Sequence, residues 1–287
     1  PGDINNYTIP TSDCAALSAA SDTQPMALAA HPDDPDKMYV GVTCTAQSSQ
    51  DPADMMLYVY LFDRGTGPGT ESFTAVFNHT LNYARPREIG SWGCTPCAAT
   101  WQPWLDDITL MNVQTQGGKE IVAHPQPLLS DIDFDGNDMV LAIRDRVADQ
   151  VPSVLGNPQD TTDSALYETW AAGDLVRACD NGAGGWTMEQ NAVSGGVTGG
   201  GQNNQDGYTS ASDGEFYLDQ TPGGEHPELM SGGIAQVPGF PSVAVTAYDL
   251  NNFNGGDIGT WSNTTGLELS GAQLYQQNGT LPFFGKS

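Results

Sequence analysis

The sequence predicts an all-β fold, and within that class a β-propeller of six or seven blades. Short apolar segments rich in β-branched and aromatic residues recur between clusters of Gly, Pro, Asn and Asp, which is the pattern of strands joined by turns. Helical periodicity is nearly absent. At about 40–50 residues per blade, the 287 residues of the chain suffice for six or seven blades. A β-sandwich is the alternative fold.

Seven segments are the clearest candidates for strands. They are, in chain order, residues 37–44, 56–62, 73–77, 138–144, 173–179, 232–237 and 242–248. Segments 56–62 and 73–77 are expected to pair as a hairpin across the turn between them. Such sequential hairpins are typical of propellers and sandwiches. The stretch "AAHPDDPDKMYVGV" favours the propeller, because a His-Pro turn that leads into a strand resembles the start of a propeller blade.

Residues 160–175 are the exception, since they are expected to form a short helix. Asp163 or Ser164 would cap it and Gly173 would end it. We expect the whole chain, 1–287, to form one domain with an extended N-terminal segment at 1–24. The tail at 279–287 would close the ring or contact another subunit.

The charge balance excludes two classes of partner. Nine Lys+Arg against 35 Asp+Glu give a net charge of -26, whereas nucleic acids and anionic membranes both require a basic surface. No apolar run of about 18 residues is present, so no membrane insertion is expected. Divalent cations and basic partners remain compatible with this charge. The low charged fraction, 15%, suits an extracellular or cell-surface β protein. A salt-adapted proteome is the rival explanation for the acidity.

Five cysteines and four glycosylation sequons bear on localisation. We expect Cys14 to pair with Cys44. Cys94 and Cys97 form a "CTPC" motif, interpreted as a short-loop disulfide, with a redox pair or half a zinc site as alternatives. The sequons, which make the chain a candidate glycoprotein, begin at Asn6, Asn78, Asn263 and Asn278.

The stretch "LLSDIDFDGNDMVLAIRDR" contains the strongest candidate for a metal site. Its acids are Asp131, Asp133, Asp135 and Asp138. The first three, with Gly136, match the start of a calcium loop, in which alternating carboxylates converge on Ca²⁺. An EF-hand is excluded because Ala142 stands where its bidentate Glu is required. The alternative is a hairpin with an Asp-Gly-Asn turn and solvated carboxylates.

Three further clusters are weaker candidates. The acidic turns 31–36 and 103–108 are interpreted as solvated loops that a cation could occupy. Glu225, His226 and Glu228 are close enough in sequence to share a metal ion or a proton. The tryptophans near the CTPC motif either fill the core or form a platform for sugar rings; they are Trp92, Trp101 and Trp104.

Four stretches together resemble a known family. They are "PLLSDIDFDGNDMVLAIRDRVADQ", "AAGDLVRACDNGAGGWTMEQN", "GGIAQVPGFPSVAVTAYD" and the terminal "FFGKS". The chain from about residue 25 onward resembles a propeller-like region of large bacterial surface proteins that also carry serine–aspartate-repeat-type B-like modules. The resemblance implies a secreted module without catalytic residues. In the family pattern a second Cys lies shortly after the Trp-containing loop. This chain has Ser194 in that region, so Cys179 lacks the partner that the resemblance implies.

We therefore expect a non-enzymatic structural or adhesive module, the repeating subunit of an extracellular filament stabilised by Ca²⁺. Its partners would be further copies of itself, as a homopolymer or tandem array, or surface glycans. Leu281, Phe283 and Phe284 would contact the next subunit by strand addition. The alternatives are a calcium-dependent propeller hydrolase or lactonase and a glycan-binding lectin.

Overall fold

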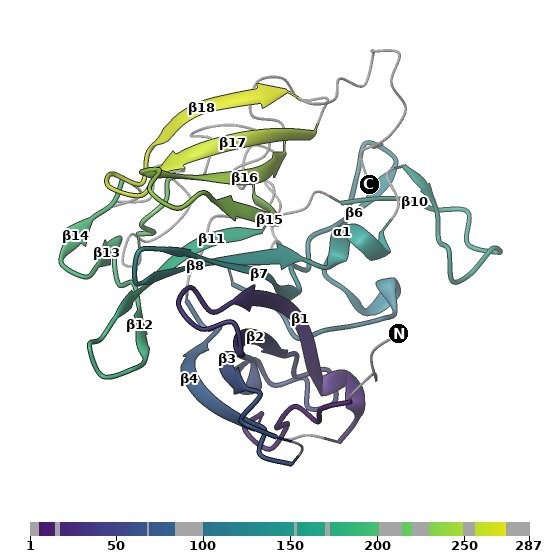
Figure 1. Ribbon diagram of the computed structural model, residues 1–287. Helices are drawn as coiled ribbons and strands as arrows, with labels where there is room; N and C mark the ends of the chain where they lie inside the picture. Colours follow the sequence, from purple (N-terminus) through teal and green to yellow (C-terminus); the bar gives the residue numbers. More distant parts are fainter. Residues whose placement is uncertain are drawn as a thin grey trace, which may run out of the picture.

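The computed structural model describes residues 6–14, 18–67, 69–83, 100–151, 154–169, 173–200, 214–219, 230–248 and 256–273. Strands dominate these residues and form four four-stranded sheets and one two-stranded sheet (Figure 1). Helix is limited in the described ranges to the single turn α1 (Val147–Gln150) and three 3₁₀ turns, at Ala20–Asp22, Pro52–Asp54 and Ile108–Leu110. The protein is thus mostly β, as the sequence predicts.

Three of the sheets are antiparallel, and the first and last of them are meanders of consecutive strands. The first sheet consists of β1 (Thr23–Ala30), β2 (Lys37–Cys44), β3 (Met56–Asp63) and β4 (Ser72–Thr80). The middle sheet consists of β7 (Pro127–Asp135), β8 (Asp138–Asp145), β11 (Asp174–Asp180) and β12 (Trp186–Met188). The last sheet consists of β15 (Met230–Gln236), β16 (Ser242–Tyr248), β17 (Gly256–Ser262) and β18 (Glu268–Gln273).

The remaining strands form two smaller sheets. One is mixed, with the order β5-β6-β10-β9 and a parallel β6–β10 pair. Its strands are β5 (Val113–Gln116), β6 (Lys119–Val122), β9 (Leu155–Gly156) and β10 (Leu166–Glu168). The other is the hairpin of β13 (Val193–Ser194) and β14 (Val197–Thr198).

The middle sheet lies between the first and last sheets (Figure 1), because β7 contacts β1 and β2 on one side and β15 on the other. The residues of β8 alternate between two cores: Met139, Leu141 and Ile143 pack toward the first sheet, and Val140 and Ala142 toward the last. A strand buried on both faces requires a continuous apolar run. This burial on both faces explains why the residues from Met139 to Ile143 are all apolar.

Two close approaches hold the stack together. A Cβ built on Gly41 of β2 would lie 2.6 Å from Leu129 Cδ2, so only glycine lets the first and middle sheets pack at this distance. Between the middle and last sheets, Phe216 and Tyr217 are fully buried. The indole of Trp261 donates a hydrogen bond of 2.8 Å to the backbone oxygen of Leu218. The segment 214–219 therefore fills the space between these two sheets.

All seven predicted strand segments coincide with strands, namely β2, β3, β4, β8, β11, β15 and β16. The hairpins β3–β4 and β7–β8 also pair as predicted. The meanders have the strand order of propeller blades, but the sheets do not close into a ring within the described ranges. The six- or seven-bladed propeller and the single-domain boundaries stay predictions.

The predicted helix at 160–175 is wrong. Asp160 and Asp163 instead form side-chain turns, accepting hydrogen bonds from the backbone N–H groups of Thr162 and Ala165. Such local bonds compete with helix formation. Tyr167 then enters β10, where its ring is buried in a small apolar cluster. Tertiary packing therefore overrides the helical pattern.

Candidate functional site

Asp131 and Asp133 of the acidic stretch connect the middle sheet to the last sheet. Asp131 Oδ2 accepts a hydrogen bond of 3.1 Å from the backbone N–H of Ile234, and Asp133 Oδ2 accepts one of 2.6 Å from that of Gln236. These two carboxylates thus occupy backbone donors of the edge strand β15. Burial raises the pKa of Asp131, while the bonds from Ile234 and Ile132 act in the opposite direction.

Asp135 and Asp138 flank the β7–β8 turn and bind one arginine. Arg177 Nη2 of β11 lies 2.8 Å from a carboxylate oxygen of each. Its Nη1 donates to the backbone oxygen of Asn263 at 3.2 Å, and its guanidinium lies 5.1 Å from the ring centroid of Phe216. Arg177 is 7% exposed, so this ion cluster links the turn to the last sheet from within.

The four acids of the predicted calcium loop thus divide into two pairs with different partners. In the described ranges no group of three or more His, Cys, Asp or Glu has an arrangement suited to a metal ion. The hairpin with its turn at Gly136 and Asn137 is present. Calcium binding at the stretch stays a prediction, and it would require Asp135 and Asp138 to release Arg177 or share it with the ion.

A second group of acids, mostly withdrawn from solvent, adjoins a pocket of about 380 Å³ that opens to the surface beside Asn82 and Asn191. The pocket is lined by residues from three parts of the chain, including His79, Tyr83, Glu189 and Glu215. The hydroxyl of Tyr83 donates to Asp174 Oδ2 at 2.5 Å and accepts a 3.1 Å bond from the indole of Trp101. Burial raises the pKa of Tyr83 well above its usual value, and the charge of Asp174 adds to this effect.

Glu189 is the central acid of this interior group. Its two carboxylate oxygens accept hydrogen bonds from the backbone N–H groups of Arg177 and Phe216. Burial raises the pKa of Glu189 well above its usual value; these bonds oppose the shift, and the charges of Asp174 and Asp219 add to it. Asp219 in turn accepts a 3.1 Å bond from the N–H of Leu175. The acids thus attach the segment 214–219 to β11.

An aromatic groove of about 330 Å³ lies where the first and middle sheets meet at their turn ends. Tyr39 of β2 forms its floor, with its ring centroid 5.6 Å from that of Trp186 in an edge-to-face arrangement. The ring centroids of Phe134 and His31 lie 4.8 Å and 5.4 Å from that of Tyr39. Asp33 and Asp180 also line the groove. We call this set of residues the aromatic groove.

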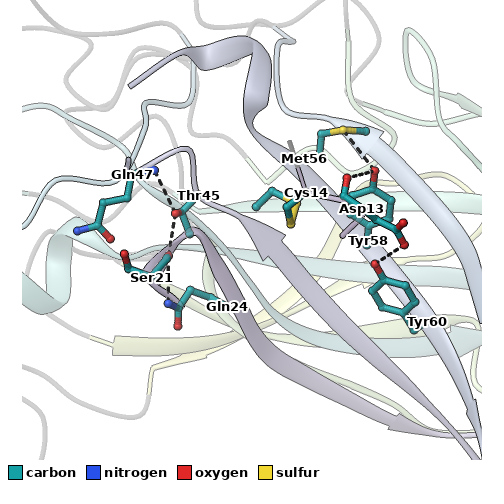
Figure 2. Close-up of a disulfide and its surroundings, with 10 residues drawn as sticks. Asp13, Cys14, Ser21, Gln24, Thr45, Gln47, Met56, Tyr58 and Tyr60 are labelled. Carbon is teal, nitrogen blue, oxygen red and sulfur yellow. Dashed lines mark hydrogen bonds between the residues drawn. A yellow bond between two sulfur atoms is a disulfide. The ribbon is translucent and has the colours of Figure 1, made fainter. Parts of the chain in front are cut away.

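The N-terminal segment is fixed to the first sheet by a disulfide between Cys14 and Cys44 (Figure 2), the pair expected from the sequence. Beside it, Tyr60 Oη donates to Asp13 Oδ2 at 2.7 Å and Tyr58 Oη donates to the Asp13 backbone oxygen at 2.9 Å. Cys179 is a half-buried free thiol. A disulfide is typical of proteins in oxidising compartments. In the described ranges no helix is long and apolar enough to cross a membrane.

Trp101 and Trp104 belong to the core. Trp101 is 0% exposed and Trp104 is 5% exposed. The indole of Trp104 donates to the Pro127 backbone oxygen at 2.8 Å, and the guanidinium of Arg146 covers its ring. These two side chains therefore present no face to a sugar, and the core interpretation holds for them.

The acidic turns at 31–36 and 103–108 have carboxylates paired with basic side chains. Lys37 Nζ lies 3.0 Å from Asp34 Oδ2, and Arg146 Nη2 lies 2.6 Å from Asp106 Oδ1. These local ion pairs agree with the interpretation of both turns as surface loops rather than metal sites.

The three sequons in the described ranges have different environments. Asn6 and Asn78 are exposed. Asn263 is 6% exposed, accepts a hydrogen bond from Tyr217 Oη at 2.9 Å and donates one to Gln236 Oε1 at 2.8 Å. The buried Asn263 side chain leaves no room for a glycan in the folded module, so this sequon suits a structural role.

Several predicted site residues lie outside the described ranges. They are Cys94, Cys97, Trp92, Glu225, His226, Glu228, Asn278, Leu281, Phe283 and Phe284. Conversely, sequence reasoning missed the interior acids and the aromatic groove. Their members come from segments far apart in the chain, so no local spacing indicates them. One available signal was Asp180, the acid that directly follows the predicted strand segment 173–179.

The fold and its polar contacts define a β-rich module of stacked antiparallel sheets with a disulfide at its N-terminal side. Its sequence is similar to the colossins of Dictyostelium discoideum. It is 32% identical to Colossin-A over 253 residues, which are 83% of this chain and 2% of Colossin-A. Identity to Colossin-D is 30% over 172 residues, 56% of this chain and 17% of that protein. Identity to Colossin-B is 26% over 269 residues, 87% of this chain and 6% of that protein.

The chain therefore spans a small fraction of each of these large relatives. No family model matches the chain, and no solved structure matches it. The expected resemblance to large proteins holds as a distant similarity to colossins, while the bacterial surface proteins and their B-like modules stay predictions.

Proposed function

We propose that this chain is a non-enzymatic structural or adhesive module of a large extracellular protein. The observation that carries the proposal is the scale of the similarity: it extends over 83% of this chain but only 2% of Colossin-A. A stretch of this size within so long a protein is a module. The Cys14–Cys44 disulfide supports an oxidising, extracellular setting.

The polar contacts support a structural role. Asp131, Asp133 and Glu189 each accept backbone N–H bonds from another sheet or segment, and Asp135 and Asp138 hold Arg177. Catalytic carboxylates must instead face a substrate. These acids join the layers of the module, and resistance to separation of layers is what a structural subunit needs.

We further propose that copies of the module associate into a filament that Ca²⁺ stabilises. Size-exclusion chromatography with light scattering and negative-stain imaging, each in calcium and in chelator, test this. Filaments that fray in chelator would support both the association and its stabilisation by Ca²⁺. Filaments that chelator leaves unchanged would contradict only the role of Ca²⁺. Compact monomers in both conditions would overturn the filament. Deletion of residues 279–287 should abolish association while the monomer stays folded by circular dichroism.

A hydrolase is the second candidate, and the pocket lined by His79, Glu189 and Glu215 is the observation that favours it. Two acids and a histidine lining one pocket could act as general acid and base. A panel of lactones and aryl glycosides tests it. Turnover that Glu215→Gln abolishes without loss of folding would favour the hydrolase over the structural module.

A further inference from the structure

The aromatic groove is bordered by rings from two sheets. Tyr39 is 4% exposed and lies at the bottom, while Phe134 of β7 and Trp186 of β12 are half-buried walls. The Trp186 indole donates a 2.8 Å hydrogen bond to the backbone oxygen of Asn137, which fixes the orientation of the ring. A volume of about 330 Å³ is enough for one long side chain but small for a drug-sized ligand.

Two carboxylates flank these rings from opposite sheets. Asp33 lies in the β1–β2 turn and Asp180 ends β11. Both acids line the groove together with Tyr39; burial raises the pKa of Tyr39, and the charges of Asp33 and Asp180 add to this shift. Asp180 Oδ1 accepts a 2.8 Å bond from the N–H of Gly182, which holds the carboxylate in place. The described lining residues include no Lys or Arg.

Rings combined with carboxylates suit an organic cation. Aromatic faces attract ammonium and guanidinium groups, the alkyl stem of a long basic side chain packs on apolar surface, and the acids compensate its charge. The whole chain, at -26, attracts basic partners over a longer range. A neutral sugar would stack on the rings, but the negative charge would not strengthen its binding.

We propose that the aromatic groove binds a lysine or arginine side chain of a basic partner protein, with its stem along Phe134 and Trp186 and its charged end between Asp33 and Asp180. The inference goes beyond the proposed function, because it stands on the groove alone and neither filament formation nor calcium enters it. Imaging can therefore contradict the filament while the titration supports binding at the aromatic groove, and the reverse is equally possible.

The test is an NMR titration of the 287-residue chain with acetylated and amidated tripeptides that have lysine, arginine or norleucine at the centre. The indole N–H signal of Trp186, assigned with Trp186→Phe, reports occupancy. We expect the lysine and arginine peptides to shift this signal with saturation, and the norleucine peptide to leave it unchanged. Methyl glucoside, methyl galactoside and N-acetylglucosamine serve as the glycan probes.

The decisive variant is Asp33→Asn/Asp180→Asn, since asparagine keeps the turn bond that Asp180 makes. It should weaken peptide binding by about tenfold or more, which corresponds to about 1.4 kcal/mol. The control is Asp51→Asn/Asp107→Asn, because both acids are exposed helix caps that asparagine replaces equally well. It changes the net charge by the same amount and should leave affinity within about twofold.

Four results would overturn the inference. Equal shifts with norleucine would mean apolar binding without charge recognition, and equal losses in both double variants would mean unspecific attraction to an acidic chain. Shifts with the sugars alone would assign the groove to glycans. Absence of any shift would remove the groove as a binding site.

Discussion

Single residues in this protein act across sheet boundaries, and Arg177 is the clearest case. It is buried and joined to Asp135 and Asp138 of one sheet, to the backbone of Asn263 in the next, and to the ring of Phe216. Removing one member of a buried ion cluster leaves the other charges uncompensated. The stability of the stack should therefore depend on this side chain more than on any surface pair.

Arg177→Met should lower the free energy of unfolding by about 2–4 kcal/mol, since Asp135 and Asp138 would lose their shared cation. Arg64→Met is the matched control, because the Arg64–Asp36 pair is exposed on both sides; it should change stability by no more than about 0.5 kcal/mol. Urea unfolding followed by tryptophan fluorescence measures both. Equal effects would show that the Arg177 cluster adds nothing beyond a surface pair.

His124 gives stability a defined pH dependence. Burial lowers its pKa below the usual 6.5, although its bond to the Pro103 backbone oxygen acts in the opposite direction. The folded state therefore keeps a neutral imidazole where the unfolded chain binds a proton, and stability falls as pH decreases through 6.5. His124→Gln should show a shallower decrease between pH 7.5 and 5, measured as unfolding free energy relative to each protein's own value at pH 7.5. An unchanged slope would contradict the assignment.

At the scale of elements, the first and middle sheets approach closely where β2 packs against β7. A Cβ on Gly41 would overlap Leu129 and the methyl of Ala27, so Gly41→Ala should destabilise the protein by about 1–3 kcal/mol through overpacking. Gly67→Ala is the control, because nothing lies within 4 Å of a Cβ at that position. Thermal unfolding of the two variants tests this. An unaffected Gly41→Ala would mean that the two sheets can move apart freely.

The disulfide acts on the pair β1 and β2, which it encloses. Its two cysteines are 30 residues apart, so cross-linking removes loop entropy from the unfolded chain. Cys14→Ala/Cys44→Ala should therefore lower the unfolding free energy by about 2–4 kcal/mol. Cys179→Ala, at a free thiol, is the matched control. If reductant lowered the stability of the double variant as much as that of the wild type, another disulfide would be responsible.

At the scale of the whole molecule, local patterns predicted the strands well and the site poorly. The apolar run Met139 to Ile143 indicates a buried strand from composition alone, and its hairpin follows from the Asp-Gly-Asn turn. By contrast, Asp131 binds a residue 103 positions away, Ile234, and no spacing within the acidic stretch indicates that partner. The same carboxylates that suggest a cation loop serve as acceptors for a neighbouring strand.

The helix prediction failed for a related reason. Residues 160–175 have helical spacing, but Asp160 and Asp163 bond to their own turns and Tyr167 is drawn into the mixed sheet. The aromatic groove likewise requires side chains from the β1–β2, β7–β8 and β11–β12 turns to meet, which only the stacking of sheets brings about.

The disulfide also limits how far the chain can be stretched. When force is applied at the two ends of the polypeptide, the covalent link between Cys14 and Cys44 carries the load past β1 and β2, and the loop closed by these two cysteines, which are 30 positions apart, cannot extend. At about 3.4 Å per residue, this withholds about 100 Å of length from the unravelled chain. In a tandem array every module would keep that reserve, so a pulled fibre would lengthen further under reducing conditions than under oxidising ones.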